Sequence, residues 1–147
     1  MNADEISQVA TTKFLAGYNC TQAVLFASCD RLQFDKSLAL KLATGFGAGM
    51  GREGEVCGAV SGGILALSLK YGRAEGDDRS KTDDSYARTQ AFLAHFKSRH
   101  RTVICRELIH CDLRTAEVQR FFKENDLLHQ TCVPCVRTAS ELVAAAI

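Results

Sequence analysis

The chain has 147 residues, of which 46% are hydrophobic and 24% charged, the composition of an ordinary soluble globular protein with one domain. Its 18 basic and 17 acidic residues leave a net charge of +1, so there is no global field to draw it onto nucleic acid, and we expect no nucleic-acid partner. The longest apolar stretch, around Ile64 to Leu69, is interrupted by serines and Lys70 and is far shorter than the ~20 residues of a membrane span, so no membrane span is expected.

The N-terminal residues, Met1 to Glu5, are polar and acidic and lack the basic start and apolar stretch of a secretory signal. We therefore expect a cytoplasmic protein. Seven cysteines are an odd number and a high count for such a chain. In a reducing compartment they favour metal or thiol chemistry over a disulfide framework.

Apolar residues recur at steps of three and four along nearly the whole chain, with little alternation. This predicts an all-α fold over residues 1–147, a single-domain helical bundle of about six to seven helices. The first helix is expected from about Ala3 to Ala16, where Asn2 and Glu5 form a capping box. The second opens at Asn19 as its cap and places Cys20 in its first turn.

A third helix is predicted to begin at Asp35 and to stop where a glycine-rich loop begins at Gly45. We expect this helix to bury Leu38, Leu42 and Ala43. The loop leads into a strongly apolar central helix that starts at Val56 or Cys57 and ends at Tyr71.

The stretch from Arg73 to Asp84 is polar and predicts a surface connection, followed by a helix from about Ser85. That helix is expected to bury Tyr86, Phe92, Leu93 and Phe96. Thr102 and Thr115 are the predicted caps of two shorter helices. The last helix is predicted to start near Thr131, with Pro134 in its first turn.

Four cysteines each fall in the first turn of a predicted helix: Cys20, Cys57, Cys105 and Cys132. A helix N-terminus presents unpaired N–H groups and a partial positive charge, so we expect thiolates there, with depressed pKa values. Four soft sulfur ligands suit an iron-sulfur cluster or tetrahedral zinc. A single buried cysteine more often acts only as a small hydrophobe, but the number and the repeated position favour function for the set.

The other three cysteines carry less of this argument. Cys29 lies nine residues after Cys20, on the opposite side of the same helix, and is interpreted as part of the core. Cys111 and Cys135 could approach the site as a spare ligand or a resolving thiol. The segment from Cys132 to Cys135 is similar to a redox dithiol, but no strand precedes it, as such a motif normally requires.

Two further signals are weak. The spaced glycines from Gly49 to Gly54 match a dinucleotide-binding pattern, but the preceding strand is missing, so we interpret the glycines as permitting tight turns and close helix contact. The four histidines show no paired metal spacing and are expected to be solvated or lightly packed.

Two motifs closely resemble the C_GCAxxG_C_C family: Tyr18 to Val24, and the segment from Gly45 through Glu55-Val56-Cys57-Gly58 to Gly63. The segments around Cys105 and Cys132 continue the resemblance, which covers nearly the whole chain from Phe14 to Leu142. The four family cysteines correspond to Cys20, Cys57, Cys105 and Cys132. His110 replaces a glycine of the family pattern, and Cys111 and Cys135 are extra.

The resemblance implies a redox-active protein, and it extends to the C-terminal part of split-Soret cytochromes, where such cysteines hold an iron-sulfur cluster. By this analogy we expect Cys20, Cys57, Cys105 and Cys132 to ligate a cluster, a [2Fe-2S] centre, in an electron-transfer role with a redox partner protein. Two alternatives stay open: a thiol-disulfide oxidoreductase that uses the same cysteines, and a structural zinc module. A helical domain this rich in small residues could also form a homodimer.

Overall fold

The computed structural model describes all 147 residues and contains helices, turns and one isolated backbone bridge, but no strand. The predicted all-α class is therefore confirmed, and the helices of eight residues or more number seven, within the predicted range. The helices in chain order are α1 (Ala3–Leu15), α2 (Cys20–Leu32), α3 (Lys36–Ala43), a 3₁₀ turn (Thr44–Phe46), α4 (Gly47–Met50), α5 (Gly58–Tyr71), α6 (Ser80–His100), α7 (Cys105–Ile109), α8 (Ala116–Glu124), a π-helical turn (Leu128–Cys132) and α9 (Val133–Ala146).

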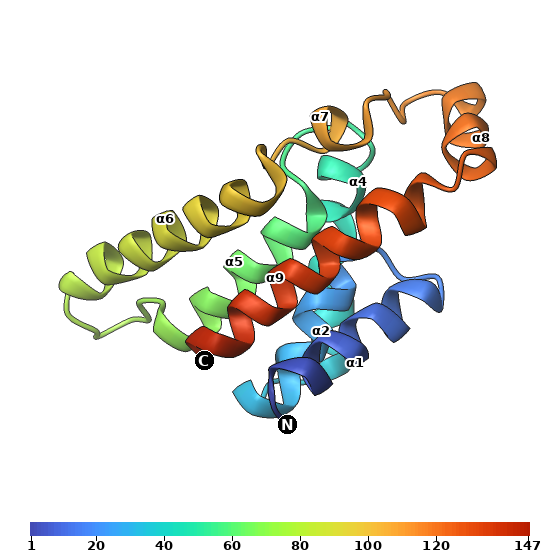
Figure 1. Cartoon of the computed structure of the whole chain (residues 1–147). Coiled ribbons are helices and arrows are strands. Elements are labelled where there is room, and N and C mark those ends of the chain that lie inside the picture. Colours follow the sequence, from blue (N-terminus) through green and yellow to red (C-terminus); the bar gives the residue numbers. More distant parts are fainter.

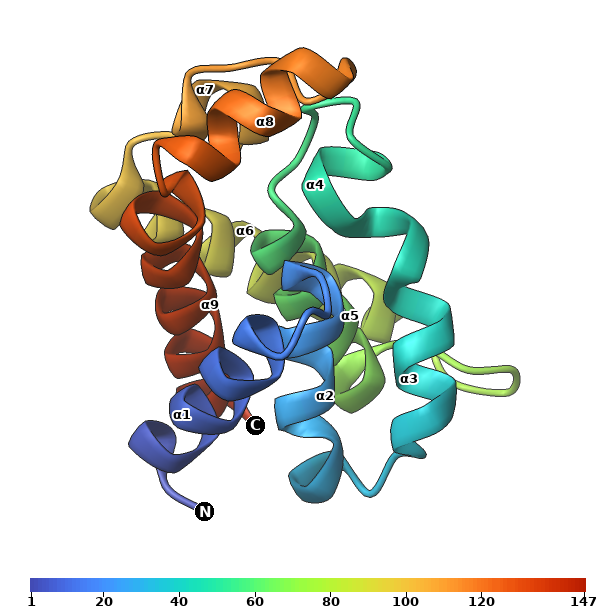
Figure 2. The ribbon, with the colours of Figure 1, turned by 90° about the vertical axis from the view of Figure 1, so that its right-hand side faces the viewer.

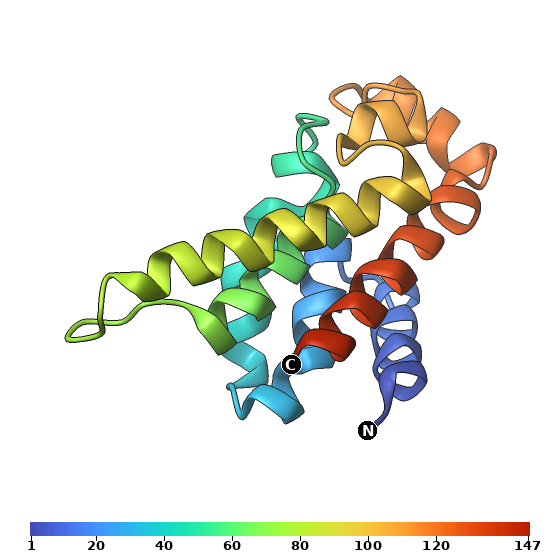
Figure 3. The same cartoon turned by 60° about the vertical axis from the view of Figure 1, so that its left-hand side comes forward.

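Helices α1, α2, α5 and α9 pack together as the body of the molecule, and α6 runs along α5 and also contacts α9 (Figures 1 and 3). One continuous apolar core joins them. Its largest fully buried side chains include one from each of these helices: Ile6, Leu25, Val60, Phe96 and Val136. The central position predicted for the apolar helix α5 agrees with this packing, because α5 contacts α2, α6 and α9 at once.

Four of the predicted helix caps are confirmed, but Thr102 does not cap α7. The N-cap of α7 is Ile104, which makes no side-chain cap hydrogen bond, and Thr102 accepts only from the Ile104 N–H before the helix begins. Asn2 and Asn19 each accept a hydrogen bond from the backbone N–H three residues later, at 2.9 Å. In return, the side chains of Glu5 and Gln22 accept hydrogen bonds from the backbone N–H groups of Asn2 and Asn19. Both helix starts are therefore complete capping boxes. Asp35 and Thr115 cap α3 and α8 through their side-chain oxygens.

Three side chains predicted to be buried are exposed instead: Leu38 at 52%, Leu42 at 49% and Tyr86 at 64%. Helix α3 turns the small residues Ala39 and Ala43 toward α2, so the neighbouring leucines face outward. Helix α6 begins earlier than predicted, at Ser80, and its first turns extend beyond the body (Figure 3). Tyr86 lies in the second of these turns and is therefore exposed. Phe92 and Phe96, farther along α6, are buried as predicted.

The two ends of the molecule differ in character. Both chain termini lie at one end, while α4, α7 and α8 gather at the other (Figures 1 and 2). Helix α8 contributes no buried residue to the body, and we call the region from His110 to Asn125, which follows α7, the cap. No helix combines the length and the hydropathy that a membrane span requires.

The close contact of α2 and α5 depends on Gly62. A Cβ at this position would stand 2.8 Å from the Thr21 carbonyl oxygen and 3.0 Å from Val24 Cβ. Gly62→Ala is therefore expected to lower the free energy of unfolding by about 1–3 kcal/mol, even though alanine favours a helix by roughly 1 kcal/mol. Urea unfolding measures this change.

Gly45→Ala is the matched control, because a Cβ there would meet nothing within 4 Å. Its unfolding midpoint should stay at or slightly above that of the wild type. A Gly62→Ala variant as stable as Gly45→Ala would contradict the tight packing described for α2 and α5.

Candidate functional site

Five of the seven cysteines border one cavity of about 260 Å³ at the base of the cap: Cys20, Cys57, Cys105, Cys132 and Cys135. The four predicted site cysteines are among them, so segments far apart in sequence converge. Cys29 lies elsewhere, buried in α2, where its thiol donates to the Leu25 carbonyl. Cys111 does not line the cavity, although it packs beside Cys105, Ile109 and Leu113.

Three of the four predicted cysteines stand at helix starts. Cys20 and Cys105 are the first residues of α2 and α7, and Cys57 is the N-cap of α5. Cys132 is different, because it ends a π-helical turn that continues directly into α9, so its predicted position at a free helix start is wrong. Pro134 explains the wider turn: its ring lacks an N–H and would clash with the carbonyl four residues earlier in a regular α-helix.

Backbone pairing brings Cys57 and Cys105 together. Val56 and Ile104 form an isolated antiparallel bridge. Next to it, the N–H of Cys57 donates to the Val103 carbonyl at 2.7 Å, and the N–H of Cys105 donates to the Glu55 carbonyl at 2.6 Å. The two helix starts are thus fixed side by side by main-chain hydrogen bonds.

Three glycines allow the remaining approaches. A Cβ on Gly58 would overlap the Cys20 sulfur and stand 2.6 Å from Thr21 Oγ1, and a Cβ on Gly47 would overlap the Asn19 side chain that caps α2. Gly49 has a φ of +67° and lies so close to α7 that a Cβ would stand 2.7 Å from the Cys105 Cβ. The glycine-rich loop therefore permits close helix contact, as its glycines predicted. It allows the starts of α2, α5 and α7 to pack against one another.

Burial keeps these thiols protonated in the metal-free protein, so the predicted depressed pKa values are wrong. Burial, and then the neighbouring Cys57, raise the pKa of Cys20 to about 12, and burial, with Cys57 and Cys20, raises that of Cys105 to about 12. The pKa of Cys132 is raised as well, first by burial and then by the surrounding cysteines. The pKa of Cys57 lies well above its ordinary value, chiefly because its thiol is hydrogen-bonded with Cys135 and because it is buried.

The helix-start N–H groups do act in the expected direction. Those of Ala48, Cys20 and Thr21 lower the pKa of Cys20, and those of Ala59 and Val60 lower the pKa of Cys57. Desolvation and mutual repulsion among the sulfurs outweigh them.

The rest of the cavity wall is mostly apolar, and Arg52 is its only charged residue. The cap contributes Leu113, Gln119 and Phe122, so α8 covers the sulfur atoms although it adds nothing to the core. Arg52 stands in the left-handed region, at a φ of +71°, in the turn that follows α4. Water-excluding walls of this kind strengthen electrostatic interactions at the sulfurs.

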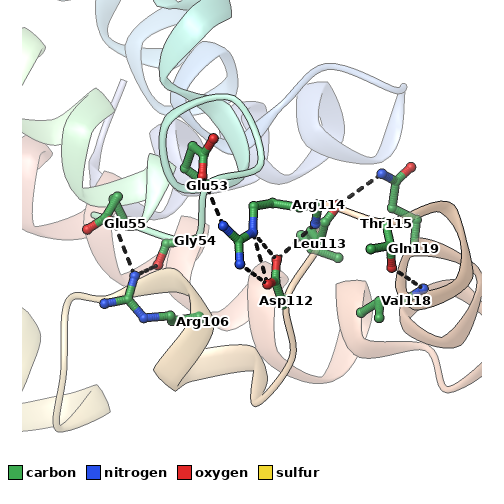
Figure 4. A network of polar contacts seen from close by, with 10 residues as sticks. All are labelled: Glu53, Gly54, Glu55, Arg106, Asp112, Leu113, Arg114, Thr115, Val118 and Gln119. Atoms are coloured by element: carbon green, nitrogen blue, oxygen red, sulfur yellow. Dashed lines mark hydrogen bonds and ion pairs between the residues drawn. The ribbon is translucent and has the colours of Figure 1, made fainter.

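Polar contacts fasten the glycine-rich loop to α7 and to the cap (Figure 4). Arg106 of α7 donates to the Gly54 carbonyl and pairs with Glu55 at 3.2 Å. Arg114 pairs with Asp112 at 2.6 Å and reaches Glu53 at 3.8 Å. All these side chains are about half exposed, so each pair contributes little to stability.

The donor set fits an iron-sulfur cluster by chemistry, because its side chains are thiols and soft sulfur is what such clusters require. No three cysteine, histidine, aspartate or glutamate side chains are grouped so as to hold a single metal ion. One buried oxygen next to the sulfurs is also unpaired: Thr21 Oγ1, which lies against Gly58 as the Cys20 sulfur does, has no hydrogen-bond partner. A sulfur acceptor would satisfy it.

Sequence reasoning missed the surroundings of Cys135. The sequence indicates only a spare ligand or resolving thiol at Cys135, and it predicts a solvated or lightly packed His100. His100 is half-buried, with Nε2 at 2.8 Å from Thr138 Oγ1 and Nδ1 at 4.0 Å from the Cys135 sulfur. The three-residue spacing from Cys132 could have placed Cys135 on the same helix face, but nothing local connects it with His100.

The raised pKa values predict that the metal-free protein loses stability in alkaline solution. In the unfolded chain these thiols ionise near pH 9, while the fold holds the protons of Cys20 and Cys105 to about pH 12. The native state binds these protons more tightly than the unfolded chain, and this difference stabilises the fold. The stabilisation is complete below pH 9 and is lost as the pH rises toward 12. The free energy of unfolding then falls by up to about 1.4 kcal/mol per pH unit for each thiol.

Urea unfolding on both sides of pH 9 measures the loss. Cys20→Ala removes one of these thiols and should give a shallower decline than the wild type. An equal decline in both proteins would argue against a buried, protonated Cys20.

Residues 18–146 match a protein-family model whose description is "Putative redox-active protein (C_GCAxxG_C_C)". The matched range contains every cysteine of the cavity. No curated protein and no solved structure matches the chain. The family resemblance read from the motifs is confirmed, while the relation to split-Soret cytochromes stays a prediction.

Proposed function

Since the chain belongs to the C_GCAxxG_C_C family of redox-active proteins, we propose that its redox centre is an iron-sulfur cluster ligated by Cys20, Cys57, Cys105 and Cys132. The observation that carries the proposal is their convergence on one largely apolar cavity from four separate segments. In an electron-transfer role the protein would exchange electrons with a partner protein. When bound, the cluster would supply one-electron chemistry.

The size of the cavity favours a cluster over a single zinc ion. Sulfurs that share one zinc stand about 2.3 Å from it and nearly touch one another, which leaves no space between them. Here no three such side chains are grouped closely enough to hold one ion, and the whole cavity that the cysteines border has a volume of about 260 Å³. A cluster has its own sulfide atoms between the irons, so its cysteine ligands stand farther apart.

The protein's own groups would support charged sulfurs. The four thiols would lose their protons on binding, which couples loading to pH. The N–H groups of Ala48 and Thr21 lower the pKa of Cys20, and those of Ala59 and Val60 lower the pKa of Cys57, so they favour the charged form of these sulfurs. Hydrogen bonds of this kind raise the reduction potential of a thiolate-ligated centre.

The decisive experiment is anaerobic purification followed by analysis for iron, sulfide and zinc and by visible absorption. We expect iron and sulfide in equal amounts, two of each per chain for a [2Fe-2S] centre. Replacing Cys20, Cys57, Cys105 or Cys132 by serine should abolish their retention, because each change removes one soft ligand.

Cys111→Ser and Cys29→Ser are the matched controls, since neither sulfur lines the cavity, and both variants should keep the cluster. Zinc without iron would replace the proposal with the structural zinc module. A metal-free protein that cycles reversibly between thiols and a disulfide would favour the oxidoreductase. Equal losses in all seven cysteine variants would contradict the ligand assignment.

A further inference from the structure

Cys135 occupies a place that the four proposed ligands do not explain. It is 1% exposed, lies on α9 and borders the cavity. Its neighbours are the Cys57 thiol on one side and His100 on the other. Cys57 and Cys135 line the same cavity, and α5 and α9 pack against each other, so the two side chains from distant segments lie together inside the protein.

His100 is held in a fixed orientation beside this pair. Its Nε2 lies 2.8 Å from Thr138 Oγ1, its Nδ1 faces the Cys135 sulfur, and its ring packs on Phe96 with centroids 4.7 Å apart. Burial, and then the charge of Arg99, lower the pKa of His100. With Nε2–H donating to Thr138, a tautomer assigned from these contacts, Nδ1 is free to accept a proton.

A route from His100 to solvent is also present. His100 lines a polar hollow of about 580 Å³ on the outer surface, together with Arg101, His110 and Gln130. Leu108 and Thr131 line both this hollow and the cysteine cavity, so a single wall separates the two. His100 therefore borders the solvent-filled hollow on one side and faces Cys135 on the other.

We propose that Cys57 and Cys135 form a disulfide in the cluster-free protein, with hydrogen peroxide as the oxidant and His100 as the group that takes the proton from Cys135. The Cys135 sulfur attacks one peroxide oxygen and breaks the O–O bond, which gives a sulfenic acid. The thiol proton reaches the departing hydroxide through His100, and one water forms. The Cys57 sulfur then attacks Cys135 and releases a second water. Two thiols are oxidised and one peroxide is reduced.

The disulfide would control loading of the cavity. Cys57 cannot be a ligand while its sulfur is bonded to Cys135, so the oxidised protein would not accept a cluster until a reductant opens the bond. This consequence rests on the proposed function, whereas the disulfide itself does not. Peroxide suits the site because it is small enough for a cavity of about 260 Å³.

The experiment oxidises metal-free, fully reduced protein with one equivalent of hydrogen peroxide, blocks the remaining thiols under denaturing conditions and maps tryptic peptides by mass spectrometry. The expected product joins the peptide of residues 53–70 to that of residues 124–137. Cys132→Ser should still give this product and Cys135→Ser should not, which decides between the two cysteines of the second peptide.

His100→Gln tests the proton acceptor, with His110→Gln as its control because His110 lines the same hollow but is not bonded to Cys135. We expect His100→Gln to slow disulfide formation roughly tenfold or more with an unchanged thermal midpoint, and His110→Gln to leave the rate unchanged. Equal rates in the wild type and in His100→Gln would remove His100 from the proposal.

A first disulfide between Cys132 and Cys135, or between any other pair, would overturn the inference, and so would the absence of a disulfide. Iron and sulfide uptake by the reduced protein, measured in parallel, keeps the two proposals apart. If the reduced protein takes up the cluster but no link between Cys57 and Cys135 forms, this inference alone fails. If the link forms but the reduced protein takes up no cluster, the proposed function alone fails.

Discussion

The close approach of main chain at Gly47, Gly49 and Gly58 is the constraint on which the cysteine cavity depends. Each glycine lies where a side chain would overlap the start of another helix or its cap. The pairing of Val56 with Ile104 fixes the same helix starts from the other side. Hydrophobic burial holds the body together, but it does not specify the position of the sulfurs to within an ångström. The glycine contacts restrict it further, because each leaves no room for a side chain between its backbone and the neighbouring helix start.

The same close packing decides the protonation state of the site. Helix-start N–H groups favour a thiolate, yet a set of sulfurs enclosed together loses hydration and repels further negative charge. Burial is the largest cause of the raised pKa of Cys20, Cys105 and Cys132. For Cys57 it is the second largest cause, after the hydrogen bond with Cys135. The fold therefore needs a positive charge in the cavity to ionise the thiols. Iron would supply that charge under the proposed function, and without it the thiols stay neutral.

Features set by local chemistry could be predicted from the sequence. The caps at Asn2, Asn19, Asp35 and Thr115 depend on contacts three residues away, so they follow from the residues themselves. The exposure of Leu38 could not be predicted, because helical periodicity does not say which face finds a partner. Likewise, the contact of Cys135 with His100 joins the start of one helix to the end of another, and only the packing of α6 on α9 creates it.

The body of the molecule provides the stability of the fold, whereas the cap controls access to the cysteine cavity. The body relies on a continuous apolar core, whereas the cap is fastened by surface contacts such as that of Arg114 with Glu53, in which both side chains are 60% exposed. Such pairs contribute little free energy, and α8 has no buried residue. Local opening of the cap should therefore cost far less than unfolding of the body. Phe122 and Leu113 of the cap line the cavity that holds the sulfurs. Local opening of the cap would therefore admit iron, sulfide or peroxide to the cavity. The helix starts that pack against the glycines would not need to move.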